Sequence, residues 1–161
     1  MKPRIDFVRV SPRALQAMSG LQNYVNASGL EHNLLELVKM RASQINGCAY
    51  CLDMHSKDAR AAGETEQRLY MLDAWREAPI YSERERAALE WTEAMTLLHP
   101  EHVPDHAFAC ARAQFSEEEL VNLSLAIVAI NGWNRLMIGF RGAAGAYQPA
   151  ARKAMAATAT V

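Results

Sequence analysis

Two cysteines and a histidine lie close together in the sequence, at spacings that suit thiol chemistry. They are Cys48, Cys51 and His55, in the stretch Cys-Ala-Tyr-Cys-Leu-Asp-Met-His. On an α-helix, at about 100° per residue, Cys51 lies about 60° and His55 about 20° from Cys48, so the three side chains share one face. The sequence therefore predicts a compact dithiol with an imidazole beside it.

Both thiols are expected at the start of a helix, with Asn46 as its N-cap. The positive end of the helix dipole stabilises a thiolate there. The dipole is strongest at Cys48, whereas the i,i+4 relation makes His55 the natural base for Cys51. Because a positioned base acts directly on the proton that must leave, we expect Cys51 to be the nucleophile and Cys48 the resolving thiol.

In this scheme the Cys51 thiolate attacks an O–O bond to give a sulfenic acid, and Cys48 condenses with it to form a disulfide. Glu36, twelve residues before Cys48, is the group we expect to hold His55 in the correct tautomer, directly or through water. The same four side chains could instead hold zinc. Structural zinc usually draws its ligands from turns rather than from one helix, so we predict a redox pair with no metal and no cofactor.

Other residues that could carry chemistry fit simpler roles. The ligand-like spacing of His99, His102 and His106 is interrupted by Pro100 and Pro104, so we expect no metal there. Cys110 is expected to be a small buried hydrophobe, and Tyr50 to serve packing. Trp133 and Met137 indicate core or a subunit contact rather than a cofactor site. Trp91, Trp133 and Phe140 are expected to shape an apolar pocket for the organic part of a hydroperoxide.

The helices that must position these residues are indicated by apolar spacing of three and four residues. They are expected at about 12–25, 30–45, 48–62, 65–78, 82–99, 104–113 and 116–138. Ser82-Glu83-Arg84-Glu85 and Ser116-Glu117-Glu118-Glu119 are capping boxes, Ser11-Pro12 is a helix start with a capping hydroxyl, and Gly63 is a helix C-cap. No strand-like alternation is present, so the sequence predicts an all-α fold of about seven helices.

The composition predicts a single globular domain over 1–161, with the redox core at about 20–140. Of 161 residues, 50% are hydrophobic and 22% charged, and the net charge of -1 disfavours nucleic-acid partners. The N-terminal residues carry charges where an export signal would be apolar, and the clean apolar run 125–130 is too short to span a bilayer. With an odd number of cysteines, three in all, a reducing compartment is indicated, and we expect a cytoplasmic protein without membrane contact.

The chain resembles the alkylhydroperoxidase AhpD-like branch of the carboxymuconolactone decarboxylase superfamily. The resemblance rests on Glu36, on Cys48-x-x-Cys51-x-x-x-His55, and on the stretch Ile-Asn-Gly-Trp-Asn-Arg at 130–135, which is similar to a segment of the family's later helix. Tyr50 differs from the best-studied AhpD type, which has a histidine beside its second cysteine. True carboxymuconolactone decarboxylases do not rely on a Cys-x-x-Cys pair, so its presence argues against lactone decarboxylation.

The resemblance implies an all-α fold, assembly into trimers or hexamers, and thiol-dependent reduction of organic hydroperoxides. It assigns Cys51 as the attacking thiol, Cys48 as the resolving thiol, and Glu36 and His55 to a proton relay. An external dithiol reductant would complete the cycle. The alternative from a different class is a non-catalytic oligomeric module that senses redox state or binds a partner.

Overall fold

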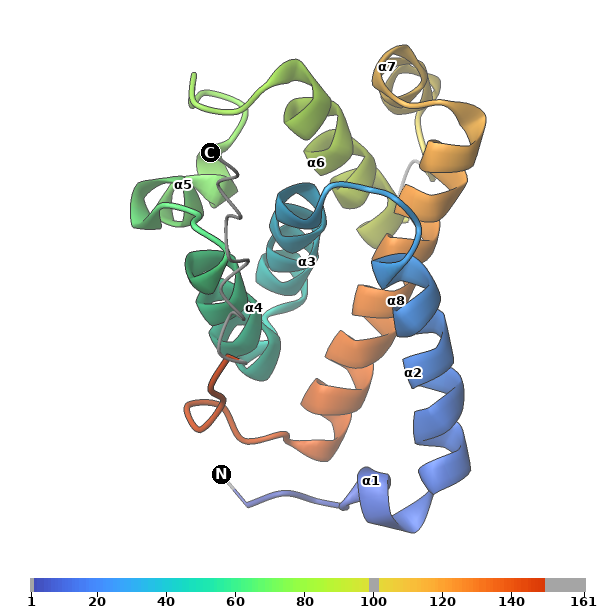
Figure 1. The fold of residues 1–161 in the computed structure, drawn as a ribbon, viewed down its shortest axis with the longest axis vertical. Helices are drawn as coiled ribbons and strands as arrows, with labels where there is room; N and C mark the ends of the chain where they lie inside the picture. The colour runs from blue at the N-terminus through green and yellow to red at the C-terminus, as the bar shows by residue number, and fades with distance from the viewer. Residues whose placement is uncertain (1, 99–101, 150–161) are drawn as a thin grey trace, which may run out of the picture.

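The computed structural model describes residues 2–98 and 102–149, and within them it contains eight α-helices, a 3₁₀ turn and no strand (Figure 1). The elements are α1 (Phe7–Val10), α2 (Pro12–Asn26), α3 (His32–Asn46), α4 (Ala49–Ala61), α5 (Glu66–Tyr70), η1 (Leu72–Ala74), α6 (Glu83–Thr96), α7 (Asp105–Gln114) and α8 (Glu117–Phe140). The all-α prediction is confirmed.

The sequence did not predict helix α1. Contacts with the end of α8 hold this helix and the residues before it in position. The Arg4 backbone N–H donates to the Phe140 carbonyl at 3.0 Å, and the Arg4 guanidinium donates to the Gly139 carbonyl at 3.1 Å. The Phe7 and Phe140 rings lie 5.5 Å apart. The N-terminal segment thus satisfies carbonyl groups at the last turn of α8, where a helix lacks partners of its own.

The longest helix, α8, packs against α2, α3, α4 and α6 and is the central element of the bundle (Figure 1). Leu123, Ile127 and Ile130 are buried along it. Its capping box forms as predicted, because the Ser116 hydroxyl accepts from the Glu119 N–H while the Glu119 carboxylate accepts from the Ser116 N–H. By length and composition alone α8 could also cross a membrane, and a third of its most apolar stretch is buried in the bundle.

Two local predictions are wrong. The helix expected at 65–78 ends at Tyr70 and continues only as the turn η1. The Arg86 guanidinium donates to three backbone carbonyl groups of this stretch, those of Trp75, Arg76 and Ala78. These carbonyl groups therefore accept from a side chain rather than from the N–H groups of a continuing helix. Ser11 is the N-cap of α2, as predicted, but its hydroxyl makes no capping hydrogen bond.

The burial pattern along α8 predicts unequal costs for two truncations on this helix. Leu123 is fully buried, so Leu123→Ala should lower the free energy of unfolding by about 2–5 kcal/mol, because it removes packed methyl groups and leaves a cavity. Val121 is 58% exposed, and Val121→Ala should change it by no more than about 0.5 kcal/mol. Urea unfolding of both variants measures the difference. Equal losses would show that the buried face of α8 is assigned wrongly.

Candidate functional site

The turn between α3 and α4 sets the positions of both thiols. Gly47 adopts the left-handed conformation with φ 67° and ends α3, and the Cys48 N–H donates back to the Ser43 carbonyl at 3.0 Å. The predicted N-cap, Asn46, is wrong, because Asn46 is still the last residue of α3. Cys48 is the N-cap of α4, and its sulfur accepts from the Cys51 backbone N–H at 3.4 Å. Cys48 is thus a capping ligand of the helix that carries Cys51.

Behind the thiols lies a layer of uncharged polar side chains that joins α3 to α8. Asn46 donates to Asn131 at 2.9 Å and to Asn134 at 2.8 Å, and Asn134 donates to the Ser43 hydroxyl at 3.0 Å. Asn134 has no exposed surface. These amide bonds fix the end of α3 against α8, and the turn that bears Cys48 is fixed with it.

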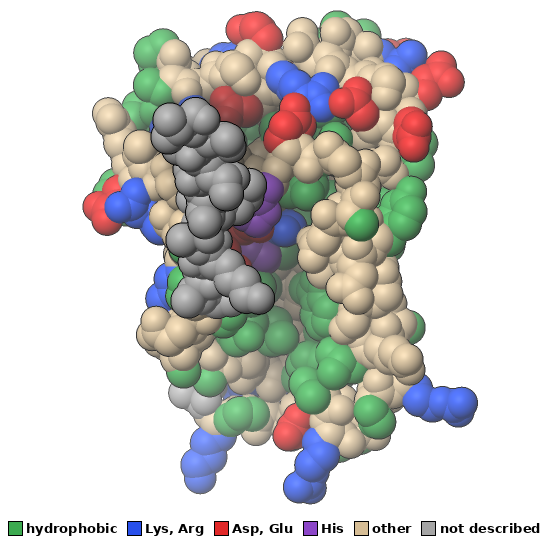
Figure 2. Space-filling view, in the orientation of Figure 1, with side chains coloured by type: hydrophobic (Ala, Val, Ile, Leu, Met, Phe, Trp, Pro, Cys, Tyr) green, Lys and Arg blue, Asp and Glu red, His purple; other side chains and the backbone are tan. Residues whose placement is uncertain are grey.

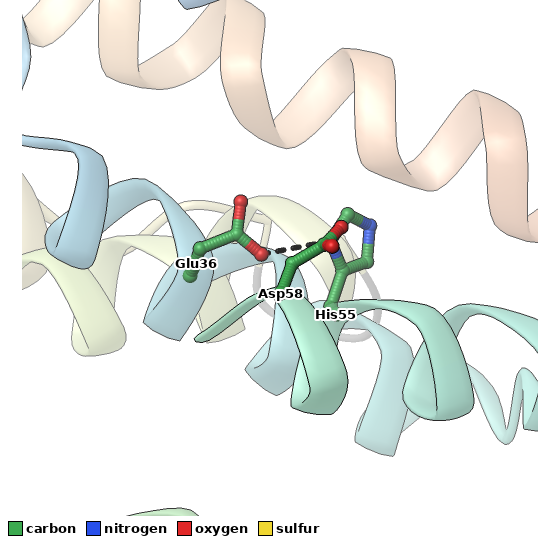
Figure 3. Close-up of side chains that lie close together, drawn as sticks. All are labelled: Glu36, His55 and Asp58. Atoms are coloured by element: carbon green, nitrogen blue, oxygen red, sulfur yellow. Dashed lines mark hydrogen bonds and ion pairs between the residues drawn. The ribbon is translucent and has the colours of Figure 1, made fainter. Parts of the chain in front are cut away.

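One turn after Cys51 on α4, His55 meets Glu36 of α3, as the sequence predicted they could (Figure 3). The Glu36 carboxylate and the His55 Nδ1 are 2.9 Å apart, and the Lys39 ammonium is 2.8 Å from the second carboxylate oxygen. All three side chains are buried. If Glu36 is ionised it accepts from Nδ1, so the neutral imidazole has its lone pair on Nε2, the nitrogen that can take a proton from a thiol.

Sequence reasoning missed Lys39 and Asp58, each of which stands three residues after a predicted site residue on the same helix. One ligand-type atom each of Glu36, His55 and Asp58 lie within 4.8 Å of one another. The Asp58 carboxylate accepts from the Tyr147 hydroxyl at 2.7 Å. The i,i+3 spacing could have indicated Lys39 and Asp58, whereas nothing in the sequence pattern places Tyr147 near them.

These groups line a cavity of about 580 Å³ enclosed by α2, α3, α4 and α8. Figure 2 shows this face of the molecule hollowed, with histidine, basic and acidic side chains inside the hollow. Cys51 and His55 lie on one wall of the cavity, and Trp133 and Met137 line it from α8. The remaining lining residues are Gln22, Asn26, Leu30, His32, Leu35, Glu36, Lys39, Tyr50, Met54 and Asp58. The space suits an organic molecule with an apolar body and a reactive polar end.

Ionisation of the two thiols is unequal. The hydrogen bond from the Cys51 thiol, together with the Cys51 N–H and Asn134, lowers the pKa of Cys48 to about 7 although burial opposes this. The same bond to Cys48, together with burial, raises the pKa of Cys51. The two shifts have opposite directions, so Cys48, at the N-terminus of α4, is the thiol of the pair that ionises first.

The carboxyl group of Glu36 is held ionised by its partners. Burial alone would raise its pKa, but the hydrogen bond with His55 and the positive charge of Lys39 outweigh burial and lower the pKa to about 2. Glu36 is therefore a carboxylate throughout the physiological pH range. It orients His55 without competing for the proton that His55 would carry.

Several other predictions on single residues are corrected. Cys110 is exposed on α7 rather than buried. Trp91 donates to the Ser124 hydroxyl at 2.9 Å and packs in the core between α6 and α8, and Phe140 packs on Phe7, so of the three expected pocket aromatics only Trp133 lines the cavity. Met137 lines it as well, so that these two residues of α8 face the cavity.

The residues that the structure brings together as a possible metal site differ from those considered as metal ligands in the sequence. Within the described part of the chain, Glu36, His55 and Asp58 form the group that could hold an ion, and neither thiol belongs to it. Both Glu36 oxygens already pair with Lys39 and His55. His102 and His106 are not part of this group, and His99 lies outside the described residues. The arrangement suits proton transfer beside a thiol better than metal binding.

The sequence profile of the carboxymuconolactone decarboxylase family matches residues 12–94, which include Glu36, both thiols and His55. The uncharacterized protein YdfG of Bacillus subtilis (strain 168) is 44% identical over 138 residues, which are 86% of this chain and 94% of YdfG. The chain belongs to the carboxymuconolactone decarboxylase family. Within the superfamily it is an AhpD-like member, as the sequence predicted.

Solved structures of the family agree with the fold. A protein of unknown function from Agrobacterium tumefaciens, provisionally described as the antioxidant defence protein AhpD, superposes with a TM-score of 0.87 at 48% identity, covering 91% of this chain and 100% of that one. The debrominase Bmp8 superposes with a TM-score of 0.77 at 23% identity, over 86% of this chain and 75% of that one, and shares the fold. The family is named for a decarboxylase, so this fold supports more than one reaction.

The opposite pKa shifts of the two thiols predict how each cysteine titrates. In wild type, thiolate absorbance near 240 nm should rise around pH 7. Cys51→Ala should move the ionisation of Cys48 upward, because it removes the S–H donor that stabilises the Cys48 thiolate. In Cys48→Ser the remaining thiol should ionise well above pH 7. A transition near pH 7 that survives in Cys48→Ser would assign the resting charge to Cys51 instead.

The lowered pKa of Glu36 predicts a loss of stability in acid. Its pKa is about 2 in the folded chain against an ordinary value of 4.5, so its contribution is complete above about pH 4.5 and disappears as the pH falls towards 2. The loss should amount to about 3 kcal/mol. Urea unfolding between pH 6 and 3 should therefore show a shallower pH dependence for Glu36→Gln than for wild type. Glu77→Gln, at an exposed carboxylate, is the control and should keep the wild-type slope.

Proposed function

We propose that this AhpD-like protein is a thiol peroxidase that reduces organic hydroperoxides by cycling between the Cys48–Cys51 dithiol and a disulfide. The observation that carries this proposal is the position of Cys51, on the wall of an organic-sized cavity that also contains the Glu36–His55 pair. An imidazole beside a thiol can take its proton, and a carboxylate on the far ring nitrogen orients that imidazole, so the three groups together can activate a sulfur nucleophile.

The first step is attack of the Cys51 sulfur on the terminal oxygen of the O–O bond of the hydroperoxide. The S–O bond forms, the O–O bond breaks, and the electron pair leaves on the alkoxide, which takes a proton to become the alcohol. His55 supplies that proton from Nε2 after taking one from the thiol pair, while Glu36 holds its Nδ1. Cys51 is left as a sulfenic acid.

The second step joins the two sulfurs. Cys48 is three residues away on the same helix turn, and its low pKa makes it a ready thiolate. It attacks the Cys51 sulfur, the hydroxyl group leaves as water with a proton, and the disulfide forms. Cys48 therefore holds the resting charge, and Cys51 is the sulfur that faces the cavity. In this proposal Cys51 attacks as its proton passes to His55, because its own pKa is raised, and Cys48 resolves.

The relatives support this class of activity in general terms. The Agrobacterium protein at 48% identity is provisionally described as an antioxidant defence protein, and that description suits a dithiol in an organic cavity. We assign the protein to antioxidant defence in the cytoplasm, with an external dithiol as its reductant and with a homo-oligomer, a trimer or hexamer, as its working form. No cofactor and no metal take part in this cycle.

The decisive experiment counts free thiols before and after one equivalent of cumene hydroperoxide. Wild type should lose two thiols and gain a Cys48–Cys51 link on peptide mapping. Cys48→Ser should stop at a sulfenic acid that dimedone traps, and His55→Asn should slow the reaction by about 10²–10⁴-fold. Cys110→Ser, at the exposed third cysteine, is the matched control and should behave as wild type.

Two results would contradict the proposal. One is a Cys51→Ser variant that reduces the hydroperoxide as fast as wild type. The other is disulfide formation that changes the size of the assembly without any turnover of hydroperoxide, and this would assign the chain to the alternative class, a redox-sensing module.

A further inference from the structure

The two thiols open to different cavities. Cys51 lines the cavity of about 580 Å³ described above, whereas Cys48 lines a second one of about 380 Å³. Tyr50 and Met137 line both and so form the partition between them. The dithiol therefore lies between two cavities, with one cysteine lining each.

The second cavity has a distinct lining. Its walls are the N-terminal turn of α4, the last turn of α8 and the segment 141–144. Small residues make up much of this lining, among them Gly47, Ala49 and Ala143, and Arg141 is the one charged residue among those that line it. A small, mostly apolar cavity of this kind suits a short aliphatic dithiol.

A thiolate that reduces the disulfide must reach one of its two sulfurs. Cys48 does not line the first cavity, so a thiolate in that cavity does not reach it. An attacking thiolate must reach one sulfur roughly in line with the S–S bond, so that the other sulfur can leave. With Cys51 facing the first cavity, the side of Cys48 away from Cys51 must be open to another space. The second cavity is the space that Cys48 lines.

We propose that the second cavity is the docking site for the dithiol reductant, which attacks the disulfide at Cys48. This inference rests on the dithiol cycle of the proposed function. It adds a separate binding site, formed by the start of α4, the end of α8 and residues 141–144, for a reductant that never enters the hydroperoxide cavity.

The reaction balances without a further reactant. One thiolate of the reductant attacks the Cys48 sulfur, the S–S bond breaks, and its electron pair goes to Cys51, which takes a proton within reach of His55. The second thiol of the reductant then attacks the reductant's first sulfur, which is bonded to Cys48 in the mixed disulfide, and expels Cys48 as a thiolate. The reductant leaves as a cyclic disulfide, two electrons and two protons poorer. The low pKa of Cys48 makes it a good leaving group in that last step.

The test uses the full-length chain with its disulfide formed by diamide, so that it does not depend on any reaction with hydroperoxide. Ala143→Trp fills the second cavity, and Met54→Trp narrows the first. Reduction by dithiothreitol should slow at least tenfold in Ala143→Trp and stay within twofold of wild type in Met54→Trp. Oxidation of the reduced chain by cumene hydroperoxide should show the reverse pattern. Circular dichroism and thermal unfolding check that both variants are folded.

A second measurement avoids substitutions. Oxidised wild type is treated briefly with 2-mercaptoethanol, quenched with acid and alkylated, and the mixed disulfide is located by mass spectrometry. The adduct should lie on Cys48. An adduct on Cys51, or equal slowing of reduction by both tryptophan variants, would overturn the inference. If the adduct lies on Cys48 while hydroperoxide leaves the dithiol unchanged, the proposed function fails and the docking site stands.

Discussion

The arrangement of the site depends on one buried carboxylate. An ionised Glu36 in the interior would cost several kcal/mol without partners, and it has two, the Lys39 ammonium on its own helix and the His55 ring on the next. Lys39 pairs with one carboxylate oxygen, and the docking of α4 with His55 towards α3 satisfies the other. Because Cys51 lies one turn before His55 on α4, the same constraint that compensates the charge also fixes where the reactive sulfur lies.

The thiols lie between two kinds of polar surroundings. On the cavity side are charged groups whose charges compensate one another, and on the α8 side are the neutral amides of Asn46, Asn131 and Asn134. Asn134 lowers the pKa of both thiols without introducing a fixed charge. A neutral donor of this kind can stabilise a sulfur anion when it is present and costs little when the sulfur is a thiol or part of a disulfide. Such surroundings suit a pair that changes its charge during each cycle.

Much of this could be predicted from local patterns in the sequence. Both capping boxes and the all-α fold follow from residue type and spacing over a few turns, whereas the place of Glu36 beside His55 was implied by the family resemblance. The N-cap of α4 could not be predicted, because the left-handed turn at Gly47 and the bond from Cys48 back to Ser43 keep Asn46 within α3. The wall that Trp133 contributes and the contact of Tyr147 depend on packing between segments about 80 to 90 residues apart, and no local pattern encodes such packing.

The segment that follows α8 lies along α4 without belonging to the helical bundle. Gly145 donates to Asp53 at 2.9 Å, Lys57 donates to the Tyr147 carbonyl at 3.0 Å, and the Tyr147 hydroxyl reaches Asp58. All three partners lie on α4, yet the segment itself lies outside the residues that match the family profile. A substitution in this short segment can therefore change the surroundings of Asp58, which lines the cavity, while leaving the helices and the dithiol in place.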